Sequence, residues 1–384
     1  MRVSRRSEIA SFQVMDVMSA ANELAAKGGP VFHLEAGEPG GPTPRAALEA
    51  AGRALAEGRI GYTEPLGLRA LRARIAGYYG TRYDIDLAPS RVIVTVGASA
   101  GFILAFLVAF DVGARIGVGL PGYPAYTNIA KVLGLEPVLL PTSRASHYQP
   151  VPDQLVANGP LDGLVIQSPA NPTGAMLGAE PLAQLCAAAR ATGTTFISDE
   201  IYHGITFGAP ARTALQFDED AIVINSFSKY FCMTGWRIGW MVVPQALVRP
   251  IERIAQNLFI SPSAISQHAA LGAFDAGDEL DARVQDYRVN RDILLGALAQ
   301  AGVADVFAPD GGFYLYCDVS RLTNDSEGFC QLLLRETGVA ATPGTDFDPV
   351  GGRTTLRLSF AGDRTTIEKA ADALGAWLRA RRQT

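Results

Sequence analysis

The sequence predicts an α/β fold, in which a mostly parallel sheet is sandwiched by helices and joined by a smaller α+β domain. The middle of the chain alternates short β-branched segments with longer segments rich in alanine and leucine, a pattern typical of β-α-β units. The chain has 384 residues, 48% of them hydrophobic, which is more than one hydrophobic core usually supports. We therefore predict two domains with a large buried core.

The predicted domains use three segments of the chain. Residues 1–44 form an N-terminal segment that belongs to the small domain, and within it Val14 to Lys27 has the pattern of an amphipathic helix. Residues 45–275 form the large domain, and residues 276–384 form the small C-terminal domain. In the small domain we expect helices over 282–302, 326–337 and 365–382, and strands over 312–318 and 355–360.

Five predicted strands each run into a polar or glycine-rich cluster. The carboxyl ends of parallel strands meet at one edge of a sheet, where α/β proteins bind ligands. One such cluster is ordinary turn chemistry, but five with complementary side chains indicate a site. The strands and clusters are 92–96 before Gly97-Ala98-Ser99, 116–120 before Pro121-Gly122-Tyr123, 164–166 before Ser168-Pro169-Ala170-Asn171, 195–197 before Asp199-Glu200-Ile201-Tyr202, and 221–224 before Ser226-Phe227-Ser228-Lys229.

Composition argues against several classes of protein. The net charge is −5 and the arginines are dispersed, so no basic surface is indicated for nucleic acid or an anionic membrane. The four cysteines and four histidines show no metal-ligand spacing. The longest apolar run, 101–110, is too short to span a bilayer, and the basic N-terminus lacks the apolar segment of a signal peptide. We expect a cytoplasmic protein without a metal.

Two motif matches point to other enzymes. Gly117-x-Gly119-x-x-Gly122 matches a dinucleotide-binding loop, but its glycines lie partly within a predicted strand and Pro121 disturbs the expected helix start. Ser226-x-x-Lys229 matches the SxxK of penicillin-binding enzymes, yet the SDN and KTG elements of those enzymes are absent from the sequence. Neither interpretation is favoured.

Lys229 is the candidate covalent catalyst. Only four of the 33 lysine and arginine residues are lysines, so lysine is not used freely here as a surface charge. Lysine, unlike arginine, can lose its proton and form a Schiff base with an aldehyde such as pyridoxal 5′-phosphate. Arg237, eight residues further on, offers a permanent cation for the phosphate.

The other clusters complement the same cofactor. A carboxylate at a buried strand end, Asp199, would keep the pyridine nitrogen protonated, although an N-cap for a following helix is the alternative. Asn171 and Tyr202 would donate to the phenolic oxygen. Tyr123 would stack on the ring, or serve only in turn packing. The phosphate would be held at a helix N-terminus by Gly97, Ala98, Ser99, Ser226, Ser228 and Arg237.

Arg357 is the candidate ligand of a substrate carboxylate. It alternates with Leu356 and Leu358, so it is expected to lie on one face of a strand in the small domain. A guanidinium held in this way binds a carboxylate through two hydrogen bonds. An interdomain salt bridge is the structural alternative.

These residues together resemble the class I/II aminotransferases, pyridoxal phosphate enzymes of fold type I, and the resemblance covers nearly the whole chain. It rests on motifs that occur in the family's order. They are Leu34-Glu35-Ala36-Gly37-Glu38-Pro39, Tyr62-Thr63 with Gly67 to Leu71, Asn171-Pro172-Thr173-Gly174, Asp199-Glu200-Ile201-Tyr202, Ser226-Phe227-Ser228-Lys229 and Arg357.

The resemblance implies a transaminase with a ping-pong mechanism. Lys229 would carry the cofactor as a Schiff base and then act as the general base, with Asp199 and Tyr202 as its catalytic partners. Asn171 and Arg357 would orient the α-carboxylate, with Gly37 beside it through its backbone. In the family Tyr62 reaches the phosphate of the neighbouring subunit, which implies a homodimer with shared active sites.

The substrates implied are an amino acid and a 2-oxo acid. Ser99 stands where some dicarboxylate-specific relatives have a lysine, and the apolar segment 256–262 is expected to approach the active site. Neutral or aromatic donors are therefore favoured, and aspartate stays open. A β-eliminating carbon–sulfur lyase on the same scaffold is the alternative, and the form Gly37-Glu38-Pro39 argues mildly against it. A non-catalytic regulator that binds the cofactor or amino acids is the more distant alternative.

Overall fold

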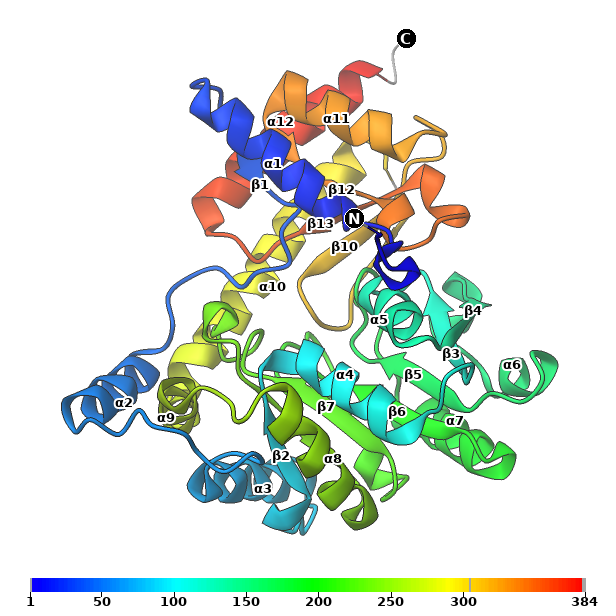
Figure 1. Cartoon of the computed structure of the whole chain (residues 1–384). Coiled ribbons are helices and arrows are strands. Elements are labelled where there is room, and N and C mark those ends of the chain that lie inside the picture. The colour runs from blue at the N-terminus through cyan, green and yellow to red at the C-terminus, as the bar shows by residue number, and fades with distance from the viewer. Residues whose placement is uncertain (1, 304, 382–384) are drawn as a thin grey trace.

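The computed structural model describes residues 2–303 and 305–381. Its larger part is built on a sheet of seven strands in the order β2-β8-β7-β6-β5-β3-β4 (Figure 1). All of these strands run parallel except β8, which is antiparallel to both of its neighbours. Their bounds are β2 Val92–Thr95, β3 Arg115–Leu120, β4 Glu136–Pro141, β5 Gly163–Gln167, β6 Thr195–Asp199, β7 Ile222–Ser226 and β8 Gly239–Val242.

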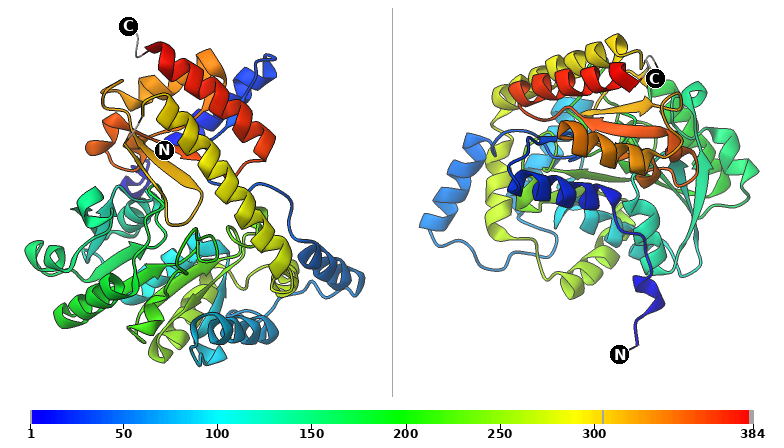
Figure 2. Two further views of the ribbon diagram at one scale, coloured as in Figure 1. Left: turned by 180° about the vertical axis from the view of Figure 1, so that it is seen from behind. Right: turned by 90° about the horizontal axis from the view of Figure 1, so that it is seen from above.

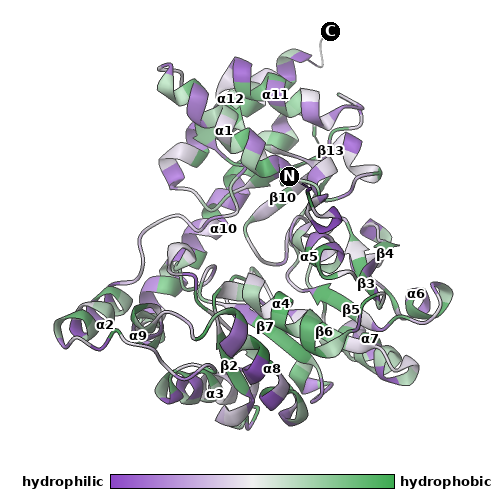
Figure 3. Ribbon diagram, viewed as in Figure 1, coloured by the Kyte–Doolittle hydropathy of each residue, from purple (hydrophilic) through white to green (hydrophobic). Residues whose placement is uncertain are grey.

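Helices cover both faces of this sheet because the strands are apolar on both sides. Consecutive residues of one strand pack into different clusters: Val223 lies in one core, whereas Ile222 and Ile224 lie in the other. Figure 3 shows these strands as hydrophobic, as expected of parallel strands buried on both faces. The helices of this part are α2 Arg45–Ala56, α3 Arg69–Tyr83, α4 Gly97–Ala109, α5 Ala125–Leu133, α6 Pro152–Ala157, α7 Ala179–Thr192, α8 Gln245–Leu258 and α9 Ala264–Ala273.

The smaller part combines both ends of the chain. Its antiparallel sheet has the order β12-β13-β10-β9, and β1 pairs in parallel with β11. Helices α10 and α12 lie together on one side of the sheet, and α1 and α11 lie on the other (Figure 2). The bounds are α1 Gln13–Ala26, β1 Phe32–His33, α10 Gly277–Gln300, β9 Val306–Phe307, β10 Tyr314–Asp318, α11 Ser326–Thr337, β11 Val339–Ala340, β12 Thr342–Pro343, β13 Thr355–Ser359 and α12 Arg364–Arg381.

The predicted fold class is confirmed, and most element bounds agree within a few residues. Helix α10 begins at Gly277, earlier than the predicted residue 282, because Asp278 and Glu279 favour the first turn of a helix. The predicted final helix end at residue 382 lies outside the described residues. The predicted domain boundaries at residues 45 and 276 stay predictions.

The topology gathers the strand ends that the sequence indicated. Because β2, β7, β6, β5 and β3 run in the same direction, the residues that follow them lie along one edge of the sheet. Gly117 and Gly119 lie within β3 itself, which removes the apparent dinucleotide loop. Across 2–303 and 305–381, no helix combines the length and the apolarity needed to cross a membrane.

Candidate active site

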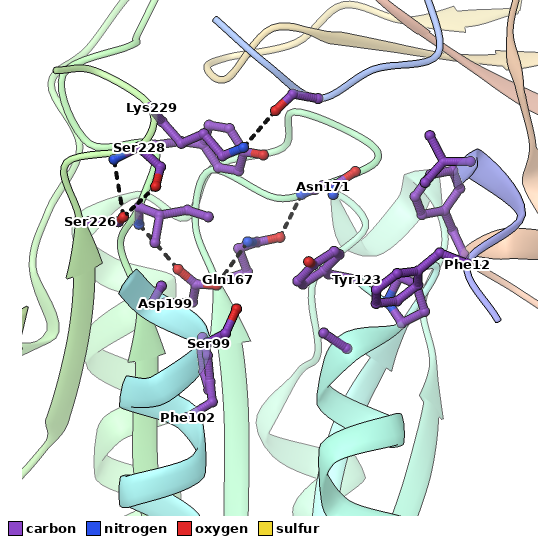
Figure 4. A pocket seen from close by; sticks show the side chains of 18 of the residues that line it. Phe12, Ser99, Phe102, Tyr123, Gln167, Asn171, Asp199, Ser226, Ser228 and Lys229 are labelled. Atoms are coloured by element: carbon purple, nitrogen blue, oxygen red, sulfur yellow. Dashed lines mark hydrogen bonds between the residues drawn. The ribbon is translucent and has the colours of Figure 1, made fainter. Parts of the chain in front are cut away.

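A cavity of about 330 Å³ lies at the carboxyl ends of the central strands and beneath the smaller part (Figure 4). A volume of this order is that of a small-molecule site. The site residues predicted from the sequence line it, except Tyr62 and Gly97. Those lining it are Gly37, Ala98, Ser99, Tyr123, Asn171, Asp199, Tyr202, Ser226, Ser228, Lys229, Arg237 and Arg357.

Lys229 reaches into this cavity from the turn after β7. Its Nζ donates to the carbonyl oxygen of Gly37 at 2.5 Å and lies 5.9 Å from the centre of the Tyr202 ring. Burial, together with the nearby Arg357 guanidinium, lowers the pKa of Lys229 to about 8. A substantial fraction of this amine is therefore neutral near pH 8, which a nucleophile or a general base requires.

Asp199, at the end of β6, is a buried carboxylate with three donors. Oδ1 accepts from the backbone N–H of Ile201 at 3.1 Å, and Oδ2 accepts from Gln167 Nε2 at 2.9 Å and from the Tyr126 hydroxyl. Burial raises the pKa of Asp199 to about 6, against the effect of these hydrogen bonds. Its oxygens face a turn rather than a following helix, so the N-cap alternative is wrong.

Arg357, in β13, is buried with its guanidinium held in place. Nη1 donates to Asn171 Oδ1 at 2.8 Å, and Nη2 donates to the carbonyl oxygen of Glu35. The guanidinium lies 4.3 Å from the centre of the Tyr314 ring, and its Nε has no hydrogen-bond partner among the described residues. Among the residues that the structure describes, no ion pair involves Arg357, so the salt-bridge alternative is wrong.

Tyr202 and Tyr314 form a hydroxyl pair at 2.8 Å between Lys229 and Arg357. Burial raises the pKa of Tyr202 well above its ordinary value, so the phenol keeps its proton and can donate. A Cβ atom at Gly37 would collide with the Tyr314 hydroxyl, so only glycine fits there. The backbone of Gly37 can therefore approach the cavity closely.

A cluster of donors at the start of α4 can hold a phosphate. Helix α4 begins at Gly97, and a Cβ there would lie 2.6 Å from Arg237 Nη2, which places the guanidinium against the first turn. The hydroxyls of Ser226 and Ser228 lie 3.0 Å apart on the same side of the cavity. The N–H groups of a first helical turn, hydroxyls and a guanidinium together suit a dianion.

An apolar part of the wall includes residues at the start of α1. Phe12 stacks on Tyr123 with ring centres 6.0 Å apart, and the Gln13 N–H donates to Asp346 at 2.8 Å, which ties this segment to the cavity rim. Burial raises the pKa of Tyr123 to about 12. The other apolar side chains of the lining are Val14, Met15, Ala98, Phe102, Pro124, Ala125, Ile129, Ile201 and Phe347.

Tyr62 is 86% exposed and does not line the cavity of its own chain, so its predicted contact with a neighbouring subunit stays a prediction. One other sequence-based expectation is not met. The apolar segment Gln256–Pro262 was expected near the active site, but none of its residues contributes to the lining, and Leu258 and Ile260 are exposed. This segment ends α8 and passes along the outside of the larger part, beside Thr63, whose N–H donates to Ser261 Oγ.

Sequence reasoning missed Gln167, Tyr126, Tyr314 and Phe12. Tyr126 falls within the Pro-Gly-Tyr-Pro-Ala-Tyr segment, and Gln167 is the one polar residue of β5, so a buried strand carrying a glutamine was the available signal. Tyr314 and Phe12 carried no such signal, because their positions depend on how the smaller part packs over the cavity.

Replacing Glu200 with glutamine should make stability less dependent on pH. Its Oε1 accepts from Ser198, Thr213 and the N–H of Ala214, and burial raises its pKa from 4.5 to about 8. A carboxyl with a raised pKa costs stability as pH rises from about 4.5 to 8, because unfolding releases its proton. The measurement is the free energy of unfolding in urea at pH 5 and at pH 8. Relative to the wild type, that of Glu200→Gln should be higher at pH 8 than at pH 5 by on the order of 4 kcal/mol.

Glu23 is exposed, so Glu23→Gln is the control and should shift unfolding equally at both pH values. An equal effect of Glu200→Gln at both pH values would contradict the assignment of a proton to the buried carboxyl.

Comparisons with known proteins agree with this arrangement. The sequence profile of the family "Aminotransferase class I and II" matches residues 30–374. A valine–pyruvate aminotransferase from Mycobacterium tuberculosis is 43% identical over 98% of both chains. The crystal structure of an aminotransferase from the same organism is 42% identical, with a TM-score of 0.97 over 99% of this chain and 100% of the other. An aspartate aminotransferase from Thermus thermophilus is 31% identical, with a TM-score of 0.92 over 98% of this chain and 100% of the other. The chain therefore belongs to the class I and II aminotransferases and is a transaminase.

Proposed function

We propose that this enzyme uses pyridoxal 5′-phosphate, bound covalently at Lys229, to move an amino group from an amino acid to a 2-oxo acid in two half-reactions. The observation that carries the proposal is a lysine with a pKa lowered to about 8 in a cavity that also contains Asp199, Arg237 and Arg357. When bound, this cofactor supplies an aldehyde and an electron-withdrawing ring that stabilises negative charge beside the amino group.

The residues present fit the cofactor at three points. Arg237, Ser226, Ser228 and the first turn of α4 suit its phosphate, and the close approach of Gly97 to Arg237 leaves no room for a larger side chain. Asp199 would keep the ring nitrogen protonated, because its carboxylate is buried and supported by donors. Asn171 and Tyr202 can donate to a phenolic oxygen, and Tyr123 offers a ring face.

One group of the chain moves the substrate proton, and two others bind and orient the substrate carboxylate. Lys229 Nζ removes the proton from the substrate α-carbon and returns it, since it is an amine of the lining whose pKa is lowered to about 8. Arg357 binds the α-carboxylate with its forked donors, and Asn171 holds that guanidinium in position. The Gly37 carbonyl keeps the amine directed into the cavity.

We further infer that the amino donor is neutral and apolar. The cationic side chains of the described lining are Lys229, Arg237 and Arg357, each of which already has a role, and Asp346 adds a negative charge to the rim. A second substrate carboxylate would therefore lack a cation from this chain, whereas Phe12 and Ile129 offer apolar surface. The relative named valine–pyruvate aminotransferase supports the same class.

A panel of donors tests this function. The purified enzyme, loaded with pyridoxal phosphate, should transfer amino groups from valine or phenylalanine to pyruvate with kcat/KM at least about 10-fold above aspartate. A preference for aspartate would contradict the proposed specificity. Release of ammonia and pyruvate from donors with a leaving group on Cβ, without transfer, would indicate a lyase instead.

We also propose a homodimer in which Tyr62 reaches the neighbouring active site. Tyr62 and Ile60 are exposed, and Leu258 and Ile260 are exposed on the segment next to them. An apolar patch of this kind is typical of a surface that another subunit covers. Light scattering should therefore give twice the 40.7 kDa mass of one chain, and a single-chain mass would contradict the shared site.

A further inference from the structure

Gln167, the last residue of β5, has no role in the function described above. Its side chain lies between Asp199 and Asn171. Its side chain is 7% exposed and contributes to the lining of the cavity (Figure 4). In the parallel pair of β5 and β6, Gln167 stands directly opposite Asp199. The register therefore sets its amide beside the carboxylate.

The orientation of this amide is determined by a backbone donor. The N–H of Asn171 can only donate, and it lies 2.7 Å from Gln167 Oε1, so this atom must be the oxygen. The NH₂ group of Gln167 then faces Asp199 Oδ2 at 2.9 Å and must donate to it. Both hydrogen bonds are buried, and a buried amide that lost one partner would pay a desolvation cost.

The two bonds extend into a continuous chain across the cavity. Asn171 accepts from Arg357 through its side-chain oxygen at 2.8 Å while its backbone N–H donates to Gln167. Gln167 in turn donates to Asp199. A hydrogen-bonded path thus links the guanidinium for the substrate carboxylate to the carboxylate for the cofactor nitrogen.

We propose that Gln167 is a positioning residue that holds Asp199 and Asn171 in fixed relation, so that the cofactor ring and the substrate carboxylate are bound in register. The inference rests on the proposed function, since it assumes that Asp199 meets the cofactor nitrogen. Its donor stabilises the charged form of Asp199, and its acceptor fixes the backbone that carries the Asn171 amide.

Two variants separate the bonds, and one neighbour serves as the control. Gln167→Glu keeps an acceptor for the Asn171 N–H but replaces the donor to Asp199 with a second carboxyl. Gln167→Met removes both bonds at similar length. Gln149 is also buried, and its Nε2 donates to the backbone oxygens of Gln167 and Ala175 at 3.1 and 3.2 Å. Gln149→Met therefore loses two hydrogen bonds nearby and none to Asp199.

Calorimetric titration of the cofactor-free protein with pyridoxal phosphate and, separately, with inorganic phosphate tests the inference. Inorganic phosphate reports only on the cluster of Arg237, Ser226 and Ser228, whereas the side-chain hydrogen bonds of Gln167 go to Asp199 and Asn171. Both Gln167 variants should raise the Kd for pyridoxal phosphate about 10-fold or more, as loss of a hydrogen bond to a charged group predicts, and leave the Kd for phosphate within about threefold. Gln149→Met should leave both within about threefold.

After loading at saturating cofactor, Gln167→Met should also raise KM for the amino donor more than it lowers kcat, because Asn171 holds Arg357. Unchanged affinity for pyridoxal phosphate in both Gln167 variants would overturn the inference, and so would an equal loss for both ligands, which indicates general damage. Failure of the wild type to bind pyridoxal phosphate would instead overturn the proposed function.

Discussion

Replacing Lys229 with alanine should reduce transamination by about 10⁴-fold or more. Lys229 Nζ lies in the cavity with its pKa lowered to about 8, so it can give up and recover a proton under working conditions. The other cations of the described lining, Arg237 and Arg357, carry guanidinium groups, which do not form Schiff bases and cannot replace the lysine. Steady-state transfer from valine to pyruvate is the measurement.

Lys131 supplies the matched control. It is an exposed lysine on α5, so Lys131→Ala should leave the rate within about twofold of the wild type. A Lys229→Ala enzyme that keeps a tenth or more of the wild-type rate would contradict the assigned role.

Replacing Arg357 with alanine should lower kcat/KM for α-amino acids by about 10³-fold, mainly through KM. The guanidinium is buried and oriented by Asn171 and the carbonyl of Glu35, so two donors are pre-arranged for a carboxylate. Lysine at this position keeps the charge but loses the fork, so Arg357→Lys should recover only part of the loss.

Amines without an α-carboxylate distinguish binding from general damage. With such donors the wild type and Arg357→Ala should react at similar low rates, because neither forms the salt bridge. Arg353→Ala, which removes an exposed arginine just before β13, should behave as the wild type. An Arg357→Ala enzyme with an unchanged KM for valine would show that the carboxylate binds elsewhere.

Much of the site was predictable because parallel strands place their carboxyl ends together. Ser99, Asn171, Asp199 and Lys229 follow different strands, yet each lines the same cavity, as the strand-end argument predicted. Their roles stay predictions, since location alone does not establish them. The positions of the strand ends can be predicted from the period of the hydrophobic pattern, which the sequence shows directly.

Two of the residues that sequence reasoning missed have a different origin. Tyr314 and Phe12 belong to the smaller part and enter the cavity because that part packs over the strand ends. The strand β8 was likewise missed, because a four-residue apolar segment is too short for its pattern to identify a strand. Tyr62 shows the opposite case, since its expected contact requires a second subunit.

The fold class, the family motifs and the chemical character of the candidate catalytic groups can be predicted from sequence, because they depend on residue type and local periodicity. The partners that surround these groups depend on the tertiary structure. Arg357 meets Asn171 and Glu35 across 186 and 322 residues of chain, respectively. Contacts over such separations depend on how distant elements pack. The burial that lowers the pKa of Lys229 and the hydrogen bond from Gln167 to Asp199 depend on the same packing.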